Sequence, residues 1–117
     1  MKVLVVDNEP DVRSMLRHML KVNEGTVHES DSGEAALEEW QSLSPDLVIT
    51  DHLMPGITGI QLAASLREQG LEGPILLFSA HLDTGVMQQA RDADIVTISK
   101  VDHQSLLRFL RALRAEI

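Results

Sequence analysis

Short extended runs alternate with segments of helical periodicity along the chain, and this alternation most constrains the fold. Strands are predicted at 2–6, 26–30, 47–50, 74–78 and 95–99. Apolar residues dominate these runs except in 26–30, which alternates polar and apolar residues as a strand near a sheet edge does. Helices are predicted at about 10–21, 34–43, 59–69 and 84–92, with a last helix from 103 onward.

Capping and turn residues set the predicted helix boundaries. The segment Asn23-Glu24-Gly25 interrupts the first helix, and Asp31, with Glu34 three residues later, fits a capping pattern for the second. Thr58 is expected to cap the third helix. Trp40 lies at helical spacing within the second helix, and we interpret it as a packing residue.

Strand and helix alternation with short connections predicts a parallel sheet with helices on both faces, because such crossovers are right-handed. We predict an α/β fold of the flavodoxin-like (βα)5 type, doubly wound, with five strands in the order 2-1-3-4-5. In that order the first and third strands flank the point where the winding reverses. A crevice then opens between their carboxyl ends, where such folds place their chemistry.

Polar residues directly follow four of the predicted strands and should meet at that rim. They are Asp7, Asp51, Ser79 and Lys100. Asp51 alone would often be a cap, but an acid, an acid, a hydroxyl and an amine at one sheet edge favour a functional site.

The residue types at this rim point to phosphoryl chemistry. Two facing carboxylates repel each other unless a cation joins them, and an all-oxygen ligand set favours Mg²⁺ or Mn²⁺ over zinc. Ser79 can hydrogen-bond a phosphoryl oxygen and Lys100 can neutralise another. Asp51 is then left as a carboxylate nucleophile that would form an aspartyl phosphate.

Size and composition exclude several classes of function. The 117 residues suit one domain, 1–117, and 44% hydrophobic with 24% charged residues is typical of a globular protein. Apolar stretches are shorter than a membrane span, cysteine is absent, and a strand stands where a signal sequence would begin, so we expect a cytoplasmic protein without membrane contact. A net charge of −8 argues against direct nucleic-acid binding.

The chain resembles a response-regulator receiver domain of two-component signalling over essentially all 117 residues. The residues that carry the resemblance are Val5-Val6-Asp7-Asn8-Glu9-Pro10, Asp51-His52-Leu53-Met54-Pro55-Gly56, Ser79-Ala80 and Lys100. The resemblance implies that Asp51 accepts a phosphoryl group from a histidine kinase, a histidine phosphotransfer protein or a small phosphodonor. The chain would then be a signalling phosphoacceptor with some intrinsic self-phosphorylation and dephosphorylation, not an enzyme with a separate substrate.

The same resemblance assigns roles to the other rim residues. The metal ligands would be Asp7, Asn8, Asp51 and the backbone carbonyl of Leu53. Ser79 and Lys100 would bind phosphoryl oxygens, with the small Ala80 beside them. Movement of Ser79 would reshape the surface of the fourth helix, fifth strand and fifth helix, which a downstream effector or a second copy would then contact.

Three positions depart from the family pattern. Asn8 replaces the usual second acid, Thr97 replaces the usual aromatic switch residue, and Val101 replaces a proline. Glu9 either compensates for Asn8 or points outward as the residue that opens the first helix. Because a non-proline cis bond costs roughly 2.5–4 kcal/mol, we expect the bond between Lys100 and Val101 to be trans or, if cis, strained.

Some alternatives stay open from the sequence. His81, two residues after Ser79, either tunes water access to the phosphoryl group or is a plain loop histidine. The departures at Asn8, Thr97 and Val101 also fit a pseudo-receiver, a binding module that works without phosphorylation. An aspartate-nucleophile hydrolase or a flavodoxin-like enzyme fits less well, since no acid stands two residues after Asp51 and the first loop is acidic. The chain would be either free-standing or part of a longer regulator.

Overall fold

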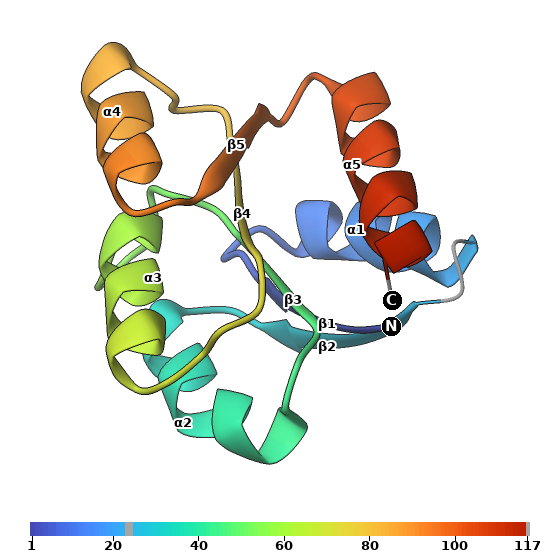
Figure 1. The fold of residues 1–117 in the computed structure, drawn as a ribbon, viewed down its shortest axis with the longest axis horizontal. Helices are drawn as coiled ribbons and strands as arrows, with labels where there is room; N and C mark the ends of the chain where they lie inside the picture. Colours follow the sequence, from blue (N-terminus) through green and yellow to red (C-terminus); the bar gives the residue numbers. More distant parts are fainter. Residues whose placement is uncertain (23–24, 117) are drawn as a thin grey trace.

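The computed structural model describes residues 1–22 and 25–116, in which strands and helices alternate strictly (Figure 1). The strands are β1 Lys2–Val6, β2 Thr26–Ser30, β3 Leu47–Thr50, β4 Ile75–Ser79 and β5 Val96–Ser99. The helices are α1 Pro10–Val22, α2 Gly33–Leu43, α3 Gly59–Glu68, α4 Thr84–Asp92 and α5 His103–Glu116. Asn23 and Glu24, which are predicted to interrupt the first helix, lie outside the described residues.

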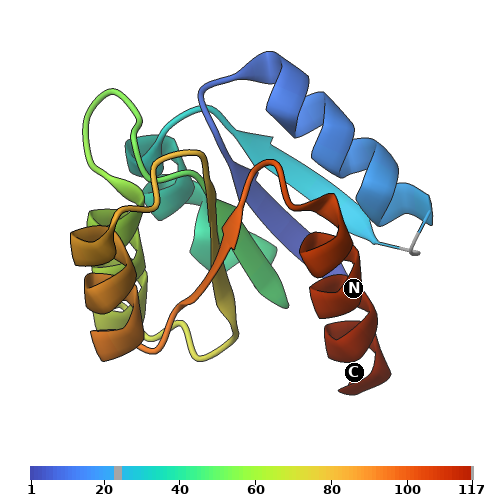
Figure 2. The same ribbon diagram turned by 90° about the horizontal axis from the view of Figure 1, so that it is seen from above.

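All strand pairs are parallel, and the sheet has the order β2-β1-β3-β4-β5, which confirms the predicted fold class. Helices α1 and α5 cover one face of the sheet, and α2, α3 and α4 cover the other (Figures 1 and 2). Because both faces are covered, β1, β3 and β4 are apolar almost throughout.

Alternate residues of each strand supply the two layers of the core. In β1, Leu4 and Val6 pack in the layer that contains Trp40, whereas Val3 and Val5 pack in the layer of α1 and α5. Trp40 is buried and its indole N–H donates to Gln69 Oε1 at 2.8 Å. This confirms that Trp40 is a packing residue.

The helix starts follow the capping logic, with one correction. Thr58 forms a full capping box with Gln61 at the start of α3, as its sequence position predicts. The cap of α2, however, is Ser32, whose side chain accepts from Ala35 N, and not Asp31. Ser32 is still in extended backbone, so α2 begins one residue later than an Asp31 cap requires. This leaves Glu34 free for another contact, described below.

The described helices contain no segment both long and apolar enough to cross a bilayer.

Candidate functional site

The two acids of the site are brought together by the pairing of β1 with β3. Val6 lies opposite Thr50, and Asp51 N donates to the Val6 carbonyl at 3.0 Å, so Asp7 and Asp51 leave the sheet side by side. Both side chains are buried, at 2% and 3% relative exposure. Burying two like charges is costly unless cationic groups or hydrogen-bond donors accompany them.

Lys100, which follows the edge strand β5, supplies a positive charge next to these two acids. Ser79 pairs with Ser99, and Lys100 N donates to the Ser79 carbonyl at 3.1 Å, which carries the lysine to the same rim. Its Nζ lies 2.9 Å from Asp51 Oδ2 and 3.0 Å from Asp7 Oδ2. The structure therefore brings together the two acids and the amine that the sequence places at three strand ends.

The charges of this cluster depend on one another. Burial is the largest influence on Asp7 and raises its pKa, with the charge of Asp51 adding to the rise, against hydrogen bonds from Glu9 N and Lys100. For Lys100, burial is again the largest single influence and lowers the pKa. Hydrogen bonds and charges from Asp51 and Asp7 together outweigh it, so the net pKa is raised. The ammonium form is therefore held firmly between the two acids.

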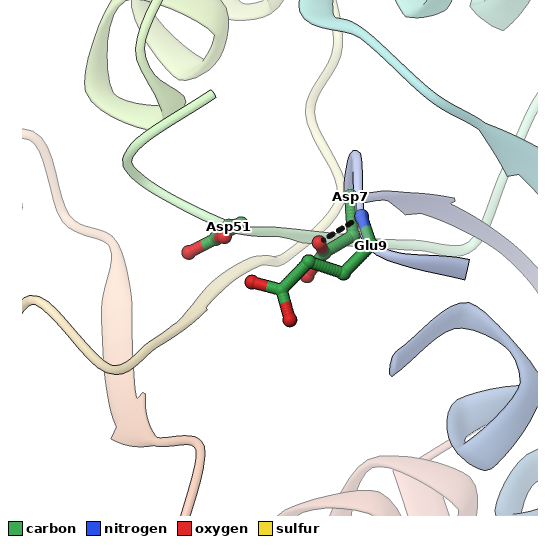
Figure 3. Close-up of side chains that lie close together, drawn as sticks. All are labelled: Asp7, Glu9 and Asp51. Atoms are coloured by element: carbon green, nitrogen blue, oxygen red, sulfur yellow. Dashed lines mark hydrogen bonds between the residues drawn. The ribbon is translucent and has the colours of Figure 1, made fainter. Parts of the chain in front are cut away.

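Glu9 joins these acids from the start of α1 (Figure 3). One carboxylate oxygen from each of Asp7, Glu9 and Asp51 lies within 4.8 Å of the others, and Glu9 Oε1 is 3.4 Å from Lys100 Nζ. Oxygen atoms at these separations suit a hard divalent cation such as Mg²⁺ or Mn²⁺. Asn8, the other sequence candidate for this role, is exposed.

The hydroxyl candidate lies at the end of β4. Ser79 is fully buried, and its Oγ accepts from His81 N at 3.0 Å, so the hydroxyl holds the turn that follows the strand. Ala80 and His81 are exposed. They line a cleft of about 390 Å³ between the segment after β3, with His52 and Leu53, and the first turn of α4.

Two of the residues that depart from the family pattern, Thr97 and Val101, lie in β5 and shortly after it. Thr97 is half-buried in β5, and Val101 is exposed at 87%. No peptide bond among residues 1–22 and 25–116 is cis, which confirms the trans bond predicted before Val101.

Sequence reasoning did not identify three residues that shape the site. A Cβ on Gly59 would lie 2.1 Å from the Asp51 carbonyl oxygen, so only glycine lets α3 begin this close to β3. Glu34 Oε1 accepts from Ile57 N at 3.0 Å and braces the loop between β3 and α3. The glycine directly after the Thr58 cap was the available signal for a close approach.

His52 is the third of these residues. Its backbone N–H donates to Asp51 Oδ1 at 2.7 Å, which fixes the orientation of that carboxylate. The ring is buried, and Nδ1 is the buried side-chain atom without a hydrogen-bond partner in the described part of the chain. Burial lowers the pKa of His52, partly opposed by the charges of Asp51 and Asp83, which favours a neutral imidazole beside the cleft.

The sequence model of the family described as the response regulator receiver domain matches residues 3–111. The chain is 40% identical over 95 residues to the transcriptional activator protein ExaE of Pseudomonas putida, which covers 80% of this chain and 44% of that protein. It is 31% identical over 117 residues to the nitrate/nitrite response regulator protein NarL of Escherichia coli K12, covering 97% of this chain and 54% of that protein.

Solved structures give the same likeness. The chemotaxis protein CheY4 of Vibrio cholerae has a TM-score of 0.86 at 27% identity, with 96% of this chain and 97% of that chain covered. The response regulator TrrA of Thermotoga maritima, in complex with Mg²⁺ and BeF, has a TM-score of 0.84 at 29% identity with the same coverage. The chain thus spans about half the length of the two curated relatives but nearly all of these two structures.

Proposed function

Because this chain belongs to the response regulator receiver family, we propose that Asp51 accepts a phosphoryl group from a histidine kinase or a histidine phosphotransfer protein. The observation that carries the proposal is the position of Asp51, a buried carboxylate with one oxygen held by a backbone N–H and the other 2.9 Å from Lys100 Nζ. A carboxylate nucleophile for phosphoryl transfer uses both neighbours, because the cation neutralises phosphoryl oxygens and the second acid helps to hold a metal ion.

The two carboxylate oxygens of Asp51 have different hydrogen-bond partners. Oδ1 accepts from His52 N and stays oriented, while Oδ2 accepts from Lys100 Nζ. Oδ2 attacks the phosphorus of a phosphohistidine, the new O–P bond forms as the P–N bond breaks, and the electron pair leaves with the imidazole, which takes up a proton. Lys100 is placed to neutralise a phosphoryl oxygen without needing to move far.

The donor set fits the divalent cation that this chemistry uses. Asp7 and Asp51 would hold Mg²⁺ or Mn²⁺ together with the Leu53 carbonyl, as the family pattern implies. Bound there, the cation would neutralise charge on the phosphoryl oxygens. The Thermotoga maritima relative, whose structure is described with Mg²⁺ and BeF, supports this assignment. Asp7 itself is oriented by Glu9 N, which donates to its Oδ1 at 2.9 Å.

Output from the phosphorylated state would begin at Ser79. Its hydroxyl now accepts from His81 N, and a phosphoryl group on Asp51 offers it a stronger acceptor. Turning toward that acceptor would release the turn between β4 and α4 and alter the face formed by α4, β5 and α5. We propose that this face contacts the downstream effector or a second copy of the chain.

Intact-mass spectrometry tests the proposal directly. The wild-type protein incubated with acetyl phosphate and Mg²⁺ should gain one phosphoryl group, and chelating the metal should prevent the gain. Asp51→Asn should remain unmodified under the same conditions. A wild-type protein that folds and binds Mg²⁺ but never gains mass would instead indicate a binding module that works without phosphorylation.

A further inference from the structure

We propose that Glu9, and not Asn8, supplies the second acidic group of the divalent-cation site, an inference that rests on the proposed function. The two residues are neighbours, but their surroundings differ. Asn8 is exposed, and it occupies the position where the family pattern has its second acid. Glu9 has a carboxylate within 4.8 Å of both Asp7 and Asp51, although its side chain is 59% exposed overall.

The direction of the Glu9 side chain is the first argument. An acid that only begins a helix gains stability by facing the free N–H groups of the first turn. Glu9 instead extends along the rim, and its carboxylate lies in the space between Asp7 and Asp51 (Figure 3). Glutamate is one methylene longer than aspartate, so position 9 can reach a point that a shorter acid would reach from position 8.

Charge balance is the second argument. Asp7, Glu9 and Asp51 carry three formal negative charges and Lys100 carries one positive charge, which leaves −2. One divalent cation neutralises that remainder. Without Glu9 the same pocket would carry −1, and a dication would bind it less strongly.

The pocket already accommodates a positive group, which is the third argument. Lys100 Nζ lies within 3.4 Å of all three carboxylates. Mg²⁺ binds oxygen at about 2.0–2.1 Å, so two ligand oxygens on opposite sides of the ion lie about 4.2 Å apart. The observed limit of 4.8 Å between oxygens is close to this span, and only small side-chain movements would bring them onto one ion.

Glu9 has the loosest contact of the three acids. Its distance to Lys100 is 3.4 Å, against 2.9 Å for Asp51 and 3.0 Å for Asp7. It can therefore move toward a metal without breaking a short ion pair.

Direct metal binding tests the proposal, with Mn²⁺ followed by electron paramagnetic resonance and Mg²⁺ by calorimetry. Glu9→Gln should weaken both metals by at least about tenfold, the lower end of what altered metal surroundings cost. Asp11→Asn is the matched control, because it removes one charge from the exposed first turn of α1, outside the cluster. It should bind like the wild type, and thermal melts of both variants would show that they fold.

The outcomes separate the two proposals. Equal affinities of Glu9→Gln and the wild type would overturn the role of Glu9, as would tenfold weakening in Asn8→Ala instead. A wild-type protein without saturable Mn²⁺ binding would also overturn it. Failure of the proposed function looks different, because metal binding would weaken in Glu9→Gln as expected while the wild type still gained no phosphoryl group.

Discussion

Replacing Gly59 with alanine probes how closely α3 must approach the phosphoacceptor. The new Cβ would lie 2.1 Å from the Asp51 carbonyl oxygen and 2.6 Å from Leu77 Cδ1. The leucine can move, but the carbonyl belongs to the backbone between β3 and the loop. Either α3 shifts outward or the Asp51 peptide rotates, and both disturb the 2.9 Å hydrogen bond from Gly59 N to the His52 carbonyl.

Two opposing effects set the expected change in the free energy of unfolding on Gly59→Ala. Overpacking a buried site costs about 1–3 kcal/mol, and removing glycine from a helix returns about 0.5–1 kcal/mol. Because the nearest contact is to backbone, we expect a cost near the upper end and a net loss of about 2 kcal/mol in unfolding free energy. The displaced Asp51 should also be phosphorylated more slowly.

Gly85 provides the matched control for this measurement. It lies in the first turn of α4, and a Cβ there meets only Asp83 Oδ1, at an ordinary 3.4 Å. Gly85→Ala should therefore stabilise the protein by up to about 1 kcal/mol. Urea denaturation of both variants gives the comparison. A Gly59→Ala protein as stable as the wild type would refute the close-approach argument.

Three further predictions concern the charges and the switch. Asn8→Asp should tighten Mg²⁺ binding by about tenfold or more, since it adds a carboxylate beside the cluster, and calorimetry showing equal affinities would contradict this. Burial raises the pKa of Asp7 above its usual 3.8, so the folded protein binds a proton at this carboxyl more tightly than the unfolded chain does. The protonated Asp7 therefore adds to the free energy of unfolding at low pH, and this stabilisation is lost as the pH rises through the pKa of the folded state. Asp7→Asn should therefore resist urea better than the wild type at neutral pH without metal, with the difference shrinking in acid. Thr97→Ala should leave the hydrogen-exchange response to a phosphoryl mimic largely intact, because a half-buried threonine changes little surface, and loss of the response in β5 would disprove that view.

The convergence of Asp7, Asp51 and Lys100 could be predicted from sequence because parallel strands end at one edge. Each residue directly follows a strand, so fold topology alone carries it to the rim. The observed strand bounds differ from the predicted ones by only a residue, for example at β4, which is predicted at 74–78 and is Ile75–Ser79 in the structure. Such shifts do not move a residue from one end of the sheet to the other.

The direction of individual loop side chains could not be predicted in the same way. Whether Glu9 faces solvent or the pocket depends on the backbone between β1 and α1, which periodicity does not describe. The burial of His52 likewise depends on the backbone of the segment after β3, which periodicity does not describe. The choice of Ser32 over Asp31 as a cap likewise depends on one residue of extended backbone.

The measurement that tests the central claim most directly is identification of the phosphorylated residue. The protein is treated with acetyl phosphate and Mg²⁺, the acyl phosphate is reduced with borohydride to a stable alcohol, and the peptides are sequenced by tandem mass spectrometry. Reduction is expected at Asp51 alone, and none is expected when Asp51→Asn is treated in the same way. Modification at Asp7 or Glu9 in the wild-type protein, with Asp51 unchanged, would contradict it.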